Sequence, residues 1–337
     1  MTLEVRTADY HTAGEPFRIV TEGAPPIPGA TVRDRRGHAQ GSEEVDVVRR
    51  MLCHEPRGHA DMYGCFPVDP DDGGADLGAV FWHKDGYSTA CGHGTIALGA
   101  WAVDWGRVPA APDGLTDVTV DTPSGRVVAR VRCEAGAVVD VTFRNVPAWV
   151  LARGVEVPTR RGTVGVDLAW GGAFYACLPA AAARLAVTPG DLSGLIATGR
   201  EIRGALNAGR VAVHPEDPRL SEVYGTIFFD DLGDAPAGPH QRNVTVFADG
   251  EVDRSPCGSG SSARAALLAA DGRLGPGAEL RHDSIIGTTF LVRAVEALRA
   301  LGRDAVITEV RGAAYRTGEH RFVLEPRDPV GSGFVLR

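Results

Sequence analysis

Hydrophobic residues recur along this chain in short runs, and their spacing predicts an alternation of strands and helices. Residues 17–20 and 79–82 are apolar runs bounded by Gly, Pro and Asp, which is typical of short strands. Between them, the apolar positions of residues 42–53 have the spacing of an amphipathic helix. Further strands are expected at residues 118–120, 127–131 and 138–143, with a turn at residues 123–125.

The second half of the chain repeats this plan. Strands are expected at residues 163–169 and 174–178, on either side of a turn that contains Gly172. Thr188-Pro189 marks the start of one helix, and residues 192–206 carry another. Later strands are expected at residues 226–229, 243–248, 289–292, 305–310 and 322–324.

A Pro- and Arg-rich stretch from about residue 146 to 162 is the best candidate for a domain boundary. At 337 residues the chain is long enough for two domains with full cores. We therefore expect a first α/β domain over residues 1–150 and a second over residues 151–324. A C-terminal strand at about residues 325–337 is expected to return to the first domain.

Two copies of one short motif lie about half the chain apart. They are Cys91-Gly92-His93-Gly94 and Cys257-Gly258-Ser259-Gly260. Each is followed by a run rich in small residues with helical spacing, which indicates a diverged internal duplication. We expect each motif helix to be buried centrally in its own sheet, with the site in the cleft between the domains.

The motif places a thiol and free backbone N–H groups at the start of a helix, where anions bind and thiolates are stabilised. Two such helix ends would hold a carboxylate between two sulfurs. Either cysteine alone is typical of packing, but two in the same local frame favour catalysis. One of Cys91 and Cys257 would abstract a proton as a thiolate, and the other would donate one as a thiol to the opposite face.

Two polar residues close to these cysteines are expected to bind substrate. His93 projects from the first helical turn and could hold the amine or a ring substituent of a substrate. Asp253 lies four positions before Cys257 and suits a secondary ammonium. We expect no metal, since the spacing of the candidate ligands matches no standard set. Those candidates are His11, His54, Glu55 and His59.

Composition excludes several classes of function. The net charge is −8, and no block of Lys and Arg stands out, so nucleic acid and membrane surfaces are not expected partners. Neither a signal peptide nor an apolar run of about 18 residues is visible. The six Cys are scattered and expected to be free thiols in a cytoplasmic protein. Nucleotide-binding loops and the serine-hydrolase elbow are not recognisable.

Taken together, these residues make the chain resemble the proline racemase family. That family includes proline racemases, 4-hydroxyproline 2-epimerases and trans-3-hydroxy-L-proline dehydratases. The resemblance covers nearly the whole length. It runs through residues 11–16, 55–59, 91–95, 121–125, 171–175, 253–258 and 284–287.

The resemblance implies a diaminopimelate-epimerase-like α/β fold with two pseudo-symmetric domains, each with a central helix wrapped by β-sheet. It also implies an isomerase that uses no cofactor and acts on a small molecule, as a monomer or homodimer. By analogy, the substrate carboxylate would bind the N–H groups of Gly92, His93, Gly258 and Ser259. The ring nitrogen would meet His93 and Asp253.

The sequence leaves several related imino acids as possible substrates. Family dehydratases typically carry Thr at the second catalytic position, so Cys257 favours two-sided proton transfer, and we expect a 4-hydroxyproline 2-epimerase. Proline racemase and trans-3-hydroxy-L-proline dehydratase (a lyase) remain alternatives, because residues 55–64 and 86–89 look more like those branches. A non-catalytic imino-acid-binding protein and a thiol oxidoreductase fit the two cysteines less well.

Overall fold

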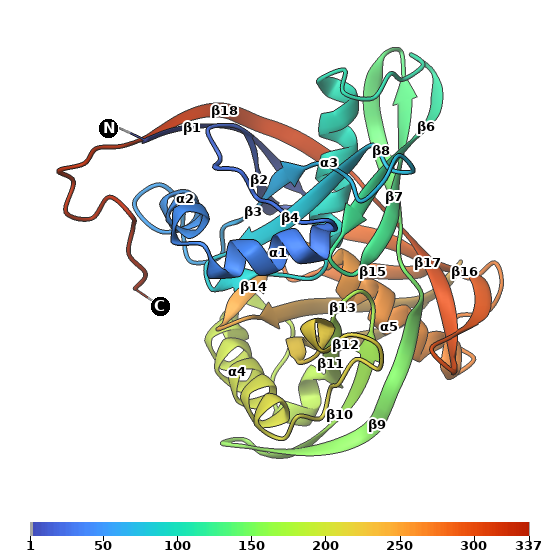
Figure 1. Ribbon diagram of the computed structural model, residues 1–337. Coiled ribbons are helices and arrows are strands. Elements are labelled where there is room, and N and C mark those ends of the chain that lie inside the picture. Colours follow the sequence, from blue (N-terminus) through green and yellow to red (C-terminus); the bar gives the residue numbers. More distant parts are fainter. Residues whose placement is uncertain (1–2, 337) are drawn as a thin grey trace. The chain divides into compact units, whose positions relative to one another are not determined.

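The computed structural model describes residues 3–336, and these fold into two compact units (Figure 1). Unit 1 holds the described residues up to Val141 and again from Ala313, and unit 2 is Thr142–Gly312. This division differs from the expected domains, because residues 142–150 join unit 2 and residues 313–324 join unit 1. The outer ends of the expected ranges, residues 1, 2 and 337, lie outside the described residues.

Unit 1 is a mixed sheet in which antiparallel and parallel pairs alternate. β1 pairs antiparallel with both β18 and β2. From β2 onward the pairs alternate: β2–β3 is parallel, β3–β4 antiparallel, β4–β6 parallel and β6–β7 antiparallel. The strands are β1 (Leu3–Thr12), β2 (Glu15–Glu22), β3 (Tyr63–Val68), β4 (Leu77–His83), β5 (Gly86–Tyr87), β6 (Gly114–Thr122), β7 (Gly125–Glu134) and β18 (Ala314–Leu324), and β8 (Ala137–Arg144) follows β7.

Unit 2 uses the same pairing plan and closes on itself. From β10 to β16 its pairs run antiparallel, parallel, antiparallel, parallel, antiparallel, and β9 joins β10 to β17. The strands are β9 (Ala148–Thr159), β10 (Gly162–Trp170), β11 (Phe174–Pro179), β12 (Val223–Ala235), β13 (Gly238–Phe247), β14 (Glu251–Asp253), β15 (Leu280–Ser284), β16 (Thr289–Ala300) and β17 (Arg303–Gly312). The shared topology agrees with an internal duplication.

Each unit encloses one helix that carries a copy of the motif. α3 (Gly92–Asp104) contacts β1, β2, β6, β7 and β18, and α5 (Gly258–Ala270) contacts β9, β10, β11, β16 and β17. Residues 92–102 of α3 and 258–268 of α5 are buried, as expected for helices without a polar face. A side chain at Gly99 would come within 2.6 Å of the Ala129 Cβ, so glycine there lets α3 lie close to β7.

The remaining helices cover the sheets. In unit 1, α1 (Val32–Gly41) and α2 (Glu43–Cys53) connect β2 to β3, and in unit 2, α4 (Leu192–Ala208) lies between β11 and β12. The predicted helix at residues 42–53 is confirmed, with Ser42 as its N-cap. Short 3₁₀ helices flank α4: η1 (Ala180–Ala183), η2 (Pro189–Asp191) and η3 (Pro218–Leu220).

The structure places two of the expected connections at somewhat different residues. The division between the units falls at Val141/Thr142, just before the expected boundary stretch of residues 146–162. Most of that stretch is β9, where Trp149 and Val157 are buried and face the core of unit 2. The end of the described chain belongs to unit 1, as expected, but the strand that pairs with β1 is β18, ahead of the expected strand at about residue 325. Within residues 325–336 the backbone forms one isolated bridge, between Phe334 and Glu55.

In the part of the chain that the structure describes, no helix is both long and apolar enough to cross a lipid bilayer.

Candidate active site

The first candidate catalytic residue, Cys91, is the N-cap of α3. Its backbone is extended, and its Sγ accepts a hydrogen bond from the N–H of Gly94 at 3.2 Å. The sulfur therefore takes the place that a Ser or Asp oxygen takes in other helix caps. Because the helix N-terminus carries partial positive charge, this geometry favours the thiolate form of Cys91.

His93 packs against the same sulfur. Its two ring nitrogens lie 3.6 and 3.5 Å from the Cys91 Sγ, and its ring meets Tyr63 edge-on at 4.9 Å. Burial lowers the pKa of His93 to about 3, so the imidazole is neutral near pH 7. A neutral ring can accept a hydrogen bond from an ammonium group.

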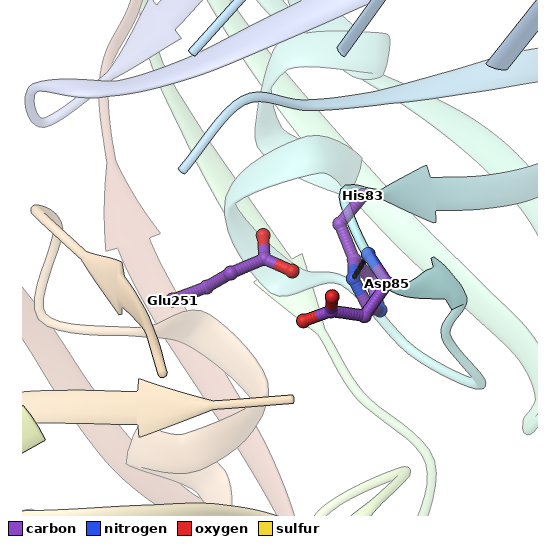
Figure 2. A group of neighbouring side chains, drawn as sticks. All are labelled: His83, Asp85 and Glu251. Carbon is purple, nitrogen blue, oxygen red and sulfur yellow. Dashed lines mark hydrogen bonds between the residues drawn. The ribbon is translucent and has the colours of Figure 1, made fainter. Parts of the chain in front are cut away.

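The turn after β4 holds two further polar residues that the sequence analysis did not select. His83 and Asp85 lie at the β4–β5 connection, where the Asp85 N–H donates to His83 Nδ1 at 3.2 Å (Figure 2). The His83 ring contacts Tyr63 with ring centroids 5.6 Å apart, so Tyr63 packs between His83 and His93. Glu251, also drawn in Figure 2, belongs to unit 2 and begins β14.

The second candidate, Cys257, caps α5 with an unusual backbone. Its φ is +64° and its ψ is 109°, a region that residues with a side chain rarely adopt. The turn before it holds this conformation. Ser255 Oγ accepts the Cys257 N–H at 3.1 Å, while Ser255 donates from N and Oγ to Asp253 Oδ1 at 2.8 and 2.7 Å. Strain of this kind is concentrated at functional sites.

The surroundings of Cys257 differ from those of Cys91. Burial, with the nearby Asp253 carboxylate, raises the pKa of the Cys257 thiol well above its ordinary value. Burial also raises the pKa of Asp253 to about 6, against the opposing hydrogen bonds from Ser255. The Cys257 Sγ lies 4.0 Å from the Tyr175 hydroxyl, which is 2.7 Å from Ser259 Oγ. The burial of Cys257 and the nearby Asp253 carboxylate therefore favour its thiol form.

The structure gathers the expected site residues into one group in each unit. In unit 1, Cys91, Gly92 and His93 form the first turn of α3. In unit 2, Asp253 lies at the end of β14, and Cys257, Gly258 and Ser259 start α5. The first-turn N–H groups of both helices have no carbonyl partner within the helix, so they suit a carboxylate.

Sequence reasoning missed three side chains that position these groups. Tyr175 and Ser255 contact Cys257 in unit 2, and Tyr63 contacts His93 in unit 1. Ser255 could have been found from the Asp-x-Ser-x-Cys spacing, which permits a turn that returns to the cysteine N–H. Tyr175 ends one of the segments that carry the family resemblance, but neither it nor Tyr63 has a local pattern that predicts its contact, because each lies on a strand far along the chain from its partner.

Gly94 supplies a test of the Cys91 geometry. An alanine Cβ at this position would lie 2.4 Å from Phe17 Cε2 and 2.6 Å from the Cys91 Sγ. We expect Gly94→Ala to lower the free energy of unfolding by about 1–3 kcal/mol and to change the rate at which iodoacetamide alkylates Cys91. Gly37→Ala in α1 is the matched control, because a Cβ there meets nothing within 4 Å. Equal urea midpoints for both variants would contradict this packing.

Comparison with known proteins gives a consistent result. The family model described as proline racemase matches residues 7–335. A protein named 3-hydroxyproline 2-epimerase from Burkholderia multivorans is 43% identical over 335 residues, with 98% of each chain covered. A trans-3-hydroxy-L-proline dehydratase from Azospirillum brasilense is 42% identical, covering 100% of this chain and 99% of its own.

Solved structures agree with these relatives. A hydroxyproline epimerase from Agrobacterium vitis, solved with bound trans-4-hydroxy-L-proline, matches with a TM-score of 0.91 and 32% identity, covering 99% of this chain and 96% of its own. A predicted epimerase from Pseudomonas aeruginosa matches with a TM-score of 0.58 and 13% identity, covering 94% and 99%, which speaks for the fold alone. The expected diaminopimelate-epimerase-like α/β fold is confirmed.

Proposed function

The chain belongs to the proline racemase family, and from this premise we propose that it epimerises a free hydroxyproline at Cα, with Cys91 and Cys257 as its two acid–base groups. The named relatives are epimerases and hydroxyproline dehydratases, so the chain is an enzyme of the isomerase or lyase type. The observation that carries the proposal is a cysteine at the N-cap of the central helix in both units.

The proposed reaction moves one proton off Cα and another on. The Cys91 thiolate removes the Cα proton and becomes a thiol, leaving a planar carbanion that is conjugated with the substrate carboxylate. The first-turn N–H groups of Gly92, His93, Gly258 and Ser259 stabilise the charge on that carboxylate. Cys257 then donates its S–H proton to the opposite face and becomes a thiolate. The other enantiomer is processed by the same steps in reverse.

His93 and Asp253 are proposed to bind the ring nitrogen. The neutral His93 accepts one N–H of the substrate ammonium, and Asp253 as a carboxylate balances its positive charge. Both side chains are buried, so the ammonium–carboxylate interaction would be stronger than at an exposed site.

The raised pKa of Asp253 predicts a pH dependence. Since the carboxyl is protonated below its pKa of about 6, we expect the KM for an amino-acid substrate to fall as the pH rises from 5 to 7. Asp253→Asn is expected to raise KM and to abolish the fall of KM between pH 5 and 7. A KM that stays constant from pH 5 to 7 in the wild type would contradict the role of Asp253.

The raised pKa of Asp253 also makes the stability of the fold depend on pH, in the opposite direction from the expected substrate binding. A carboxyl whose pKa is raised by burial favours its protonated form in the folded state. The contribution of Asp253 to stability is therefore largest below its unfolded pKa of about 4 and is lost as the pH rises to about 6. Activity at Asp253 thus needs the charged form that the fold disfavours.

The names of the relatives favour a 3-hydroxyproline as the main substrate. The proteins at 42–43% identity are named for 3-hydroxyproline, whereas the neighbour that holds trans-4-hydroxy-L-proline is 32% identical. The sequence analysis expected the 4-hydroxy compound, and proline itself is the third substrate to compare. The hydroxyl position is therefore the first property to measure.

A second activity, dehydration of trans-3-hydroxy-L-proline, is favoured by the names of several relatives. After the Cα proton is removed, the electron pair would form a Cα=C3 double bond as the C3–O bond breaks, and the hydroxide would take up a proton and leave as water. The resulting enamine would gain a proton at C3 and lose one from nitrogen to give a ketimine. This reaction needs one base at Cα. Cys257→Thr should therefore preserve a dehydratase and stop an epimerase.

Proton NMR in deuterated water tests the proposal directly. L-proline, trans-3-hydroxy-L-proline and trans-4-hydroxy-L-proline are incubated side by side with the full-length protein. We expect loss of the Cα–H signal and appearance of the 2-epimer, fastest for the 3-hydroxy compound. A ketimine without epimer would establish the dehydratase instead. Tight binding without any exchange would leave only an imino-acid-binding protein.

A further inference from the structure

Tyr175 makes a contact that the mechanism above does not use. It lies on β11, its side chain is fully buried, and its hydroxyl is 2.7 Å from Ser259 Oγ and 4.0 Å from the Cys257 Sγ. We propose, resting on the proposed function, that Tyr175 is a positioning residue for Cys257. Its hydroxyl donates to Ser259 while Cys257 is a thiol and to the sulfur when Cys257 is a thiolate.

Comparison of the two units shows why unit 2 needs this residue. In unit 1, the residue two positions after the cysteine is His93, whose ring reaches the Cys91 Sγ directly. In unit 2 the same place is taken by Ser259, and the Tyr175 hydroxyl bridges Ser259 and the Cys257 sulfur. Phe17, on the corresponding strand β2, packs against His93 but carries no hydroxyl.

The N-terminal cap of α5 gives a second reason why Cys257 would need a contact from Tyr175. The Cys91 sulfur accepts the Gly94 N–H in a helix cap, whereas α5 has no such side-chain cap, and hydrogen bonds from the Gly260 N–H and the Thr245 side chain only partly offset the raised pKa of the Cys257 thiol. A thiolate at Cys257 also faces the Asp253 carboxylate, which opposes its charge. A further donor to the sulfur would offset this repulsion, and the Tyr175 hydroxyl, 4.0 Å from the sulfur, is placed to supply one.

The Tyr175 phenol stays protonated while it donates a hydrogen bond to the Cys257 sulfur. Burial, followed by the charge of a Cys257 thiolate, raises the pKa of the Tyr175 phenol well above its ordinary value. The ionisable side chains facing Cys257 are Asp253 at the end of β14 and Tyr175 on β11. Ser259 can both donate and accept, so it can donate to Tyr175 once the phenol turns to the sulfur.

Alkylation of each cysteine measures this effect without any substrate. The full-length protein is treated with iodoacetamide between pH 6 and 10, and modification at Cys257 and Cys91 is followed separately by peptide mass spectrometry. We expect Tyr175→Phe to slow alkylation of Cys257 about tenfold at a given pH, the effect of a pKa rise of about one unit. The Cys91 profile should not move.

Two more variants make the result specific. Tyr224→Phe is the matched control, because the Tyr224 ring packs on Tyr175 with centroids 6.0 Å apart; it should leave the Cys257 profile unchanged. Ser259→Ala removes the competing acceptor for the phenol and keeps the backbone N–H, so it should speed alkylation of Cys257.

An unchanged Cys257 profile in Tyr175→Phe would overturn the proposal. So would a slowing of the same size at Cys91 or in Tyr224→Phe, because either would indicate general loosening of the fold. If Tyr175→Phe does not fold, slower alkylation in Ser259→Ala would overturn it. Failure of the proposed function would be seen in a different experiment, the NMR assay in deuterated water, as absence of Cα–H exchange by the wild-type protein.

Discussion

Replacing either Cys91 or Cys257 with alanine is expected to reduce the rate of epimerisation by at least about 10³-fold, within the range for loss of a general acid or base. Each cysteine has a separate role in one turnover, so neither can replace the other. The measurement is the initial rate of epimer formation by proton NMR, with far-UV circular dichroism to confirm that each variant folds.

Matched controls come from the cysteines outside the candidate site. Cys65 in unit 1 and Cys177 in unit 2 are also buried, and burial raises the pKa of both thiols. Cys65→Ala and Cys177→Ala remove a sulfur of the same size and should keep the rate within a few-fold. A Cys257→Ala variant that epimerises like the wild type would remove this residue from the mechanism.

The second large effect is on stability and concerns Arg18. This buried guanidinium contacts the buried Asp9 carboxylate at 2.9 Å and donates to the carbonyl of Leu52 at 2.6 Å. Its carbon Cζ also lies 4.3 Å from the centre of the Phe322 ring. Arg18→Met would leave Asp9 buried without this partner, so we expect the free energy of unfolding to fall by about 3–5 kcal/mol.

An exposed pair provides the control for Arg18. Arg130 contacts Asp117 at 2.7 Å, but both side chains are nearly half exposed. Arg130→Met should therefore change the free energy of unfolding by less than about 1 kcal/mol. Urea unfolding followed by circular dichroism compares the two variants. Equal shifts of the two midpoints would mean that burial of the Arg18–Asp9 pair does not matter.

The sequence predicted the central elements because their signals are local. The Cys-Gly motif and the Ala-rich runs after it predicted two buried helices, and both are present as α3 and α5. The family resemblance rests on these motifs together with further segments along the chain, and the expected fold class follows from that resemblance. The helix at residues 42–53 was also predictable, since Ser42 and the spacing of its apolar residues define it.

Other elements depend on partners far along the chain. β18 is placed by antiparallel pairing with β1, from Leu3↔Leu324 to Thr12↔Ala314, and nothing local in its sequence shows this. α1 was missed because it is mostly polar, although Thr31 and Asp34 form a capping box at its start. β9 was not expected as a strand, and its stretch was read as a domain boundary, because its exposed Arg and Pro residues conceal the buried Trp149.

The residues of the candidate site were predictable from the sequence, but the contacts that hold them in place were not. Cys91, His93, Asp253 and Cys257 could be chosen from spacing alone, and their roles stay a proposal. The left-handed backbone of Cys257 depends on three hydrogen bonds through Ser255. The contact between Cys257 and Tyr175 joins residues that are 82 positions apart, so only a folded structure could show it.

Deuterium incorporation in D2O during the first turnovers tests the central claim most directly. If two separate thiols act on opposite faces of Cα, each newly formed epimer carries deuterium at Cα while the remaining substrate keeps its proton. Deuterium that appears equally early in recovered substrate and product would show that one group serves both faces, and it would contradict the account.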